Sequence, residues 1–160
     1  MQSGKDNPLK TSYLETVRLI ERLHRQFLEV LKLELERLKI DDINNVQAFI
    51  LFNIGHDEMT VGELTDRGYY LGSNVSYNVK KLVESSYLVQ ERSLHDRRSI
   101  KVRLSEKGLS LWSKLAAIFD RHAGQLARGK LTPEELKQAA EIYKKLEAFW
   151  TQPARLLFQS

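Results

Sequence analysis

The sequence of 160 residues contains no cysteine. This absence excludes disulfide bonds, catalysis by a thiolate, cysteine-based zinc sites and redox sensing through a thiol. Glycine and proline are absent between Ser12 and Lys39, so nothing interrupts a helix over that stretch.

Long apolar runs are also missing. No run approaches the roughly 20 residues that a membrane-spanning helix needs. Residues 1–10 lack the apolar segment of a signal peptide. Hydrophobic residues still make up 42% of the chain, which is enough for a core. We therefore expect a single-domain cytoplasmic protein without a membrane partner.

The signatures of enzyme active sites are absent too. The four histidines, at positions 24, 56, 95 and 122, do not have the spacing of a metal motif such as HExxH. The sequence has no glycine-rich phosphate loop and no serine in a GxSxG context. We expect neither an enzyme nor a bound cofactor or metal.

What the sequence does contain is an informative stretch from Ser73 to Gly108. Its first part predicts a helix, because apolar residues recur at the spacing of one buried face. These residues are Val75, Val79, Leu82 and Val83. The opposite face carries the polar residues Ser73, Asn74, Ser76, Tyr77 and Lys80. A helix with such a face can enter a DNA major groove and contact base edges.

A hairpin follows this helix. Residues 87–92 and 99–104 are rich in strand-forming side chains, and the turn between them contains Asp96, Arg97 and Arg98. From Arg92 to Lys107 there are six basic and two acidic residues, within a chain of net charge +4. The order of helix, strand, basic tip and strand is that of a winged helix-turn-helix. Each piece alone also fits an amphipathic helix followed by a charged surface hairpin.

The same stretch resembles the MarR family of transcriptional regulators. The matching residues are Leu88-Val89-x-x-Arg92, Asp96-x-Arg98 and Leu104-Ser105-x-x-Gly108, with serine at 105 where the family usually has threonine. Residues 71–78 are similar to an alphaproteobacterial subgroup linked to cell-envelope remodelling genes. The resemblance implies a mainly α fold with a small β-hairpin wing (α+β) and long flanking helices that pair in a homodimer.

The flanking segments have the corresponding helical patterns. A capping box predicts a first helix from Ser12 to about Lys39, roughly 40 Å long. Such a helix carries more apolar surface than a small core can cover, and a second copy of the chain is the simplest partner. We predict one unit over 1–160, with a DNA-binding module at 41–107 and dimerisation helices at 11–40 and 105–160.

The predicted function is regulation of transcription by a homodimer on a pseudo-palindromic operator in double-stranded DNA. Ser73, Asn74, Ser76 and Tyr77 are placed to contact base edges, and Lys80 and Lys81 to contact phosphates. Arg98 is expected in the minor groove with Arg97 on a neighbouring phosphate. The resemblance implies that Asp96 braces Arg98 by a salt bridge.

Regulation by a small aromatic or phenolic effector is what the resemblance further implies. Phe49 and Phe52 share a helix face, and Phe27 and Leu31 of the first helix can complete an apolar wall. The alternative for each of these residues is an ordinary place in the core. The alternative for the whole protein is a winged-helix module that binds proteins and not DNA. The polar, neutral-to-basic face of the reading helix favours DNA.

Overall fold

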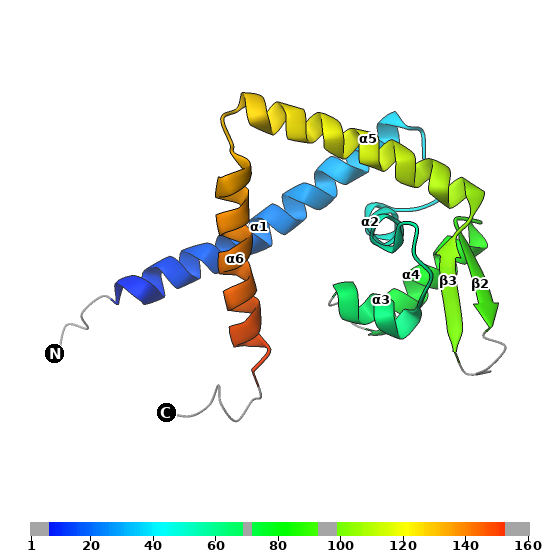
Figure 1. Ribbon diagram of the computed structural model, residues 1–160, viewed down its shortest axis with the longest axis horizontal. Coiled ribbons are helices and arrows are strands. Elements are labelled where there is room, and N and C mark those ends of the chain that lie inside the picture. The colour runs from blue at the N-terminus through cyan, green and yellow to red at the C-terminus, as the bar shows by residue number, and fades with distance from the viewer. Residues whose placement is uncertain (1–6, 69–71, 93–98, 153–160) are drawn as a thin grey trace. The chain divides into compact units, whose positions relative to one another are not determined.

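The computed structural model describes residues 7–68, 72–92 and 99–152, and it leaves the side chains of residues 72 and 73 undescribed. The chain divides into two compact units, residues 1–115 and 116–160. As predicted, the fold is mainly helical with a small sheet (Figure 1). In chain order the elements are α1 (Pro8–Arg37), α2 (Asn45–Ile54), β1 (Met59–Thr60), α3 (Val61–Gly68), α4 (Gly72–Glu84), β2 (Leu88–Arg92), β3 (Ile100–Leu104), α5 (Glu106–Arg128) and α6 (Pro133–Trp150).

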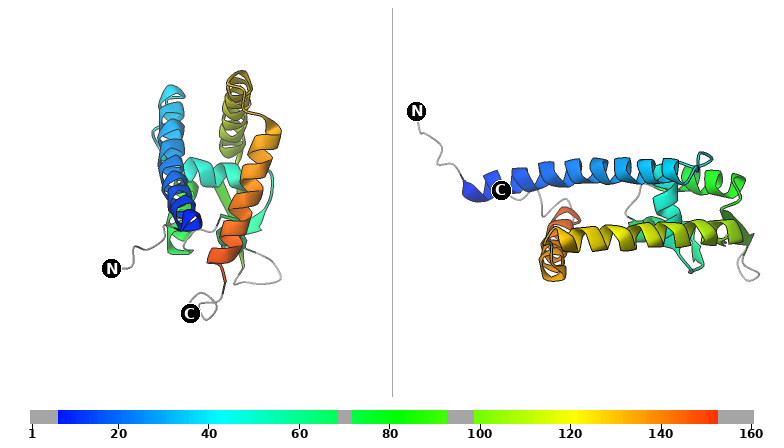
Figure 2. Two further views of the ribbon diagram at one scale, coloured as in Figure 1. Left: turned by 90° about the vertical axis from the view of Figure 1, so that its left-hand side faces the viewer. Right: turned by 90° about the horizontal axis from the view of Figure 1, so that it is seen from above.

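Helix α1 is one unbroken helix of 30 residues (Figure 2). Its first residue, Pro8, lies four residues before Ser12. The prediction that Ser12 caps this helix was therefore wrong. Asn7 is the N-cap, and its side chain accepts hydrogen bonds from the backbone N–H groups of Leu9 and Lys10. Pro8 occupies the first turn, where its missing N–H and fixed φ are favourable. An asparagine followed by proline therefore starts the helix before the serine is reached.

Local capping signals define α2 at both ends. The side chain of Asn44 accepts from the backbone of Gln47, whose side chain accepts from the backbone of Asn44, so α2 starts with a reciprocal capping box. Gly55 ends the helix with φ of 59°, a conformation that glycine adopts without the steric cost of a side chain. Thr60 then caps α3 by accepting from the Glu63 N–H at 3.1 Å.

The sheet has three antiparallel strands in the order β1-β3-β2. The predicted hairpin is present as β2 and β3, in a register that pairs Leu88 with Leu104 and Arg92 with Ile100. Strand β1, which pairs Met59 with Val102, was not predicted. It has only two residues, too few to show an alternating pattern in the sequence.

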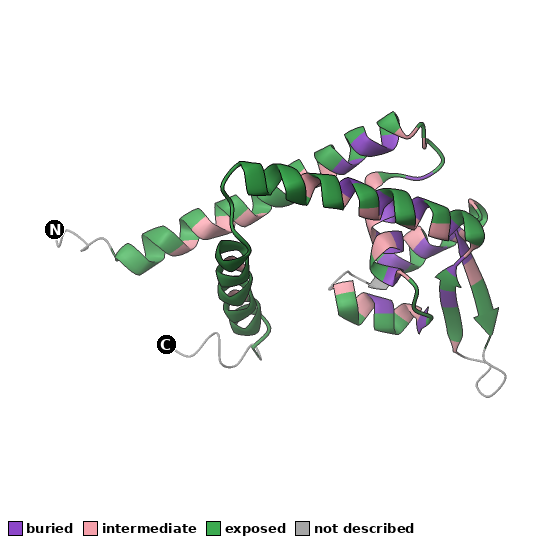
Figure 3. Ribbon diagram, turned by 45° about the horizontal axis from the view of Figure 1, so that its top comes forward, coloured by how far each residue is buried: buried purple, intermediate pink, exposed green. Residues whose placement is uncertain are grey.

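The core of the first unit joins α1, α2, α3, α4, the sheet and the first half of α5 (Figure 3). Leu31, Leu51, Leu64, Val79 and Val102 are each exposed by 2% or less. Burying a side chain of this size contributes about 1.5–3 kcal/mol. The buried residues of α1 all lie between Leu31 and Leu35, so its first five turns contribute little to this core.

The second unit contains the end of α5, a turn and α6. Thr132 forms a capping box with Glu135, and Pro133 takes the first helical position. Helix α6 has no buried residue (Figure 3). Its large exposed apolar side chains are Leu136, Ile142, Tyr143, Phe149 and Trp150.

Candidate nucleic-acid interface

Helix α4 presents the two faces that the sequence predicts. Val75, Val79 and Leu82 are at most 1% exposed and hold the helix against the core. Asn74, Ser76, Tyr77 and Lys80 are exposed, and Lys81 is half-buried. Ser73 also lies in α4, but its side chain is outside the described part of the structure. The apolar side therefore leaves a polar, partly basic surface directed away from the protein.

Tyr77 and Lys81 lie next to one another on this surface. The Tyr77 side chain is 59% exposed, and the Lys81 Nζ lies 5.7 Å from the centre of its ring. The same Nζ is 3.5 Å from Glu84 Oε2, an ion pair one turn along the helix. Among the described residues Lys80 makes no ion pair, so its charge is directed to solvent. The two neighbouring lysines thus differ in their partners.

The helix before the turn is anchored by Leu64, which is fully buried between α3 and the rest of the unit. On its outer side α3 carries Arg67, whose Nη1 lies 3.0 Å from Asp57 Oδ2. Contacts of α3 with α4 complete a helix-turn-helix.

The wing is formed by β2 and β3. Arg103 Nη2 lies 3.0 Å from Glu91 Oε1 on the neighbouring strand. Both side chains are about half exposed, so this pair organises charge on the wing without a large effect on stability. The predicted wing-tip residues Asp96, Arg97 and Arg98 lie outside the described residues, and their roles remain predictions.

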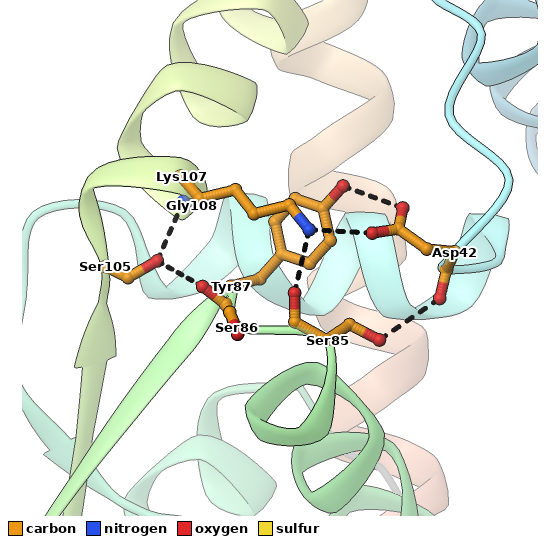
Figure 4. Close-up of polar contacts among 7 residues, drawn as sticks. All are labelled: Asp42, Ser85, Ser86, Tyr87, Ser105, Lys107 and Gly108. Atoms are coloured by element: carbon orange, nitrogen blue, oxygen red, sulfur yellow. Dashed lines mark hydrogen bonds and ion pairs between the residues drawn. The ribbon is translucent and has the colours of Figure 1, made fainter.

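A polar cluster joins the start of α5 to the loop before α2 (Figure 4). Lys107 Nζ donates to Asp42 Oδ2 at 2.8 Å and to the Ser85 carbonyl at 2.9 Å. The Tyr87 hydroxyl donates to Asp42 Oδ1 at 2.8 Å, and Lys107 lies over its ring. Ser85 follows α4, so the cluster ties the C-terminal end of that helix to the neighbouring elements.

The cluster shifts two acid–base equilibria. Burial raises the pKa of Asp42, but hydrogen bonds from Lys107 and Tyr87 and the Lys107 charge outweigh it, so the pKa lies below its ordinary value. Burial of Tyr87, together with its hydrogen bond to Asp42 and the nearby carboxylates, raises the pKa of the phenol. The cluster therefore stabilises a charged Asp42 and a neutral Tyr87.

Ser105 and Gly108, two residues of the MarR-like pattern, hold the start of α5 against β2 (Figure 4). Ser105 Oγ donates to the Ser86 carbonyl at 2.6 Å and accepts from the Gly108 N–H at 3.1 Å. A Cβ at position 108 would overlap the Tyr87 carbonyl oxygen. The pattern thus has a physical cause in the close approach of helix and strand.

An apolar cavity of about 390 Å³ lies between α1, α2 and the end of α3. Its lining residues are His24, Phe27, Leu28, Val46, Phe49 and Gly68. The rings of Phe27 and Phe49 meet edge to face, with centres 5.0 Å apart. Two of the four residues expected to bind an effector therefore share a wall of one cavity.

The other two expected effector residues lie elsewhere. Leu31 is 2% exposed and belongs to the core. Phe52 stacks on Trp112 at a centre-to-centre distance of 5.5 Å, and the Trp112 indole N–H donates to its carbonyl. Phe52 is three residues after Phe49, so the two side chains differ in direction by about 60° around the helix axis, and Phe52 meets α5. His24 and Val46 lie one turn before Phe27 and Phe49, so helical spacing alone would have identified them.

Within the described ranges no three or more acidic or histidine side chains are grouped as a metal site would require. In the same ranges no helix has the combination of length and hydropathy needed to cross a bilayer.

Known proteins are similar to this chain in sequence and in fold. Residues 43–108 match the model of a winged helix DNA-binding domain. The exopolysaccharide II synthesis transcriptional activator ExpG of Rhizobium meliloti (strain 1021) is 39% identical over 150 residues, which cover 94% of this chain and 77% of the relative.

Solved structures show the same fold at lower sequence identity. A mutant MarR from E. coli complexed with operator DNA is 19% identical with a TM-score of 0.69, over 88% of this chain and 99% of that one. Staphylococcus aureus MarR in complex with salicylate and kanamycin is also 19% identical, with a TM-score of 0.70 over 91% and 97%. The chain belongs to the MarR family of winged helix-turn-helix, DNA-binding transcriptional regulators, and not to a family of enzymes.

Proposed function

We propose that this regulator binds a pseudo-palindromic operator as a homodimer and that a small aromatic anion modulates its binding. The observation that carries the proposal is helix α4, because its buried apolar side leaves Asn74, Ser76, Tyr77 and Lys80 on a free surface beside a winged hairpin. Two such helices related by two-fold symmetry would enter successive major grooves, about 34–36 Å apart.

In this proposal Ser73, Asn74, Ser76 and Tyr77 contact base edges, while Lys80 and Lys81 contact phosphates. Arg98 enters the minor groove, braced by Asp96, and Arg97 contacts the backbone. Residues 41–107 form the DNA-binding module, and residues 11–40 and 105–160 form the dimerisation helices. Support for pairing comes from the apolar side chains of α1 and α6 that the lone chain leaves exposed.

The test is binding to the DNA upstream of the protein's own gene, followed by fluorescence anisotropy over a range of salt concentrations. We expect a footprint with two-fold symmetry and an affinity that falls steeply as salt rises. Lys80→Ala is expected to weaken binding uniformly and to lower the salt slope by about 1, as loss of one phosphate contact does. A wild-type protein that binds partner proteins but no duplex would favour the alternative of a protein-interaction module.

The 39% identical relative from Rhizobium meliloti suggests which promoters to examine. Its name describes an activator of exopolysaccharide II synthesis, so we propose polysaccharide genes as the regulated class. Transcription from such a promoter with and without the protein distinguishes activation from repression.

The cavity lined by Phe27 and Phe49 is the proposed effector site. Its volume of about 390 Å³ lies within the range of about 300–1,000 Å³ that small-molecule sites have. His24 is the polar side chain in its apolar wall and can donate a hydrogen bond to a carboxylate or phenolate. Salicylate, the ligand in the S. aureus MarR structure, is the first compound to test.

The effector proposal predicts a thermal shift with salicylate that depends on the cavity. Val46→Phe adds a ring to the cavity wall, so we expect the shift to disappear while the fold remains. Phe52→Leu changes an aromatic residue outside the cavity and serves as the control. An equal salicylate shift in wild type and Val46→Phe would place the ligand elsewhere.

A further inference from the structure

Gln47 is a buried polar residue whose side chain has a fixed orientation. It is 6% exposed and occupies the third position of α2. Its Oε1 accepts a hydrogen bond from the Asn44 backbone N–H at 3.0 Å. A backbone N–H can only donate, so the amide oxygen of Gln47 must face it. The amide nitrogen of Gln47 is thereby directed to the opposite side, towards α4.

This orientation determines the orientation of Asn78 on the recognition helix. Gln47 Nε2 donates to Asn78 Oδ1 at 3.2 Å. The only acceptor of the Asn78 side-chain amide is therefore engaged, and its Nδ2 is directed away from Gln47. Among the described residues nothing accepts a hydrogen bond from that Nδ2. No buried side-chain nitrogen or oxygen among them lacks a partner, so this nitrogen reaches solvent.

The position of Asn78 along α4 indicates what it meets in a complex. It is half-buried, one turn after Asn74 and one turn before Lys81, on the edge of the helix that contacts α2. The centre of the outward face is occupied by Tyr77. When a helix lies in a major groove, its centre faces the bases and its edges face the two flanking backbones.

The chemistry of Asn78 Nδ2 restricts which atoms of the bound DNA it can contact. Pairing with adenine requires the asparagine to present its oxygen and its nitrogen together to the base, whereas the hydrogen bond from Gln47 holds the Asn78 oxygen on the α2 side. What remains is a neutral donor directed to an acceptor. A phosphate oxygen beside the groove meets this requirement regardless of base sequence.

We propose that Asn78 donates a hydrogen bond from Nδ2 to a phosphate oxygen of the bound DNA, and that Gln47 is the positioning residue that holds the Asn78 amide in the donating orientation. The inference rests on the proposed function, since it needs α4 to lie in a major groove. It adds a phosphate contact that carries no charge.

The first test compares Asn78→Ala with wild type by fluorescence anisotropy on two duplexes. One is taken from the DNA upstream of the protein's own gene, and the other has the same composition in scrambled order. We expect affinity to fall about tenfold on both duplexes. Because a neutral donor releases no counterion, the salt slope should stay unchanged, whereas Lys80→Ala lowers it.

Two further variants test the orientation of the amide. Asn78→Asp keeps an acceptor for Gln47 but presents an oxygen to the phosphate, so it should bind more weakly than Asn78→Ala. Gln47→Glu accepts from both Asn44 and Asn78, which turns the Asn78 oxygen outward. Glutamate is common at this position of a capping box, so the helix start is preserved. We expect Gln47→Glu alone to lower the DNA affinity relative to wild type. Added to Asn78→Ala, it should lower the affinity little further.

The outcomes separate this inference from the proposed function. If Asn78→Ala binds both duplexes as tightly as wild type while Lys80→Ala shows its lower salt slope, the inference is wrong and the proposed function stands. A loss confined to the upstream duplex would overturn the phosphate assignment in favour of a base contact. An additive loss in the Gln47→Glu, Asn78→Ala double variant would overturn the positioning role. Absence of salt-dependent binding by wild type would overturn the proposed function itself.

Discussion

At the scale of single residues, Gly108 shows that a helical glycine can be required by space alone. A methyl group there would overlap the Tyr87 carbonyl and approach Leu104 Cβ to 3.2 Å. Gly108→Ala should lower the free energy of unfolding by about 1–3 kcal/mol, as overpacking does. In the same helix nothing lies within 4 Å of a Cβ at Gly124. Gly124→Ala should therefore stabilise by about 0.5–1 kcal/mol, and urea denaturation of both variants checks the contrast.

The polar cluster around Asp42 predicts a dependence of stability on pH. Because folding lowers the pKa of Asp42, its contribution is complete above the ordinary carboxyl pKa of about 4 and is lost as pH falls below it. The Asp42 and Lys107 side chains are 39% and 48% exposed, so Asp42→Asn should cost only about 0.5–1 kcal/mol at neutral pH. Thermal denaturation should show this difference shrinking in acid. A difference that is constant from neutral pH to pH 3 would contradict the assignment.

Tyr87 gives the opposite dependence in alkali. Folding raises its pKa, so the contribution of the neutral phenol to stability is present below the ordinary value of about 10 and is lost as pH rises above it.

The sequence identified Ser105 and Gly108 by their pattern but did not identify Asp42, Tyr87 and Lys107 as one cluster. Asp42 is 45 and 65 residues away from its two partners, and no local spacing encodes such contacts.

At the scale of elements, predictions succeeded where a local signal was strong and unique. Apolar spacing gave the buried face of α4, and strand-forming runs gave β2 and β3. The start of α1 failed because two caps competed, and Asn7 with Pro8 prevailed over Ser12. Strand β1 failed because its two residues are ordered by pairing with β3, which lies about 40 residues later in the chain.

Packing between elements decides which aromatic residues are available to a ligand. Phe49 and Phe52 lie on the same helix, yet one faces the cavity with Phe27 and the other stacks on Trp112. Helical spacing predicted that they share a side, but which neighbour each contacts depends on where α1 and α5 pack. That information is absent from any one segment, so only half of the expected effector residues line the cavity.

At the scale of the whole molecule, the exposed apolar side chains of α6 predict a second copy of the chain as their partner. Ile142 is 55% exposed and Leu136 is 49% exposed, on a helix that has no buried residue in the lone chain. Burial of such residues against a partner contributes about 25 cal/mol per Å² of apolar surface. A chain this rich in exposed apolar residues at one helix is expected to be dimeric.

Ile142→Glu is therefore predicted to shift the protein towards a monomer. Ala148, on the opposite side of α6 by helical spacing, offers a matched control, because Ala148→Glu adds the same charge. Light scattering after size-exclusion chromatography should give a lower mass for Ile142→Glu alone. Operator affinity should fall with it, since two half-sites are then bound by separate molecules rather than by one linked pair. A dimeric Ile142→Glu with full operator affinity would exclude this face of α6 from the dimer interface and leave α1 to provide it.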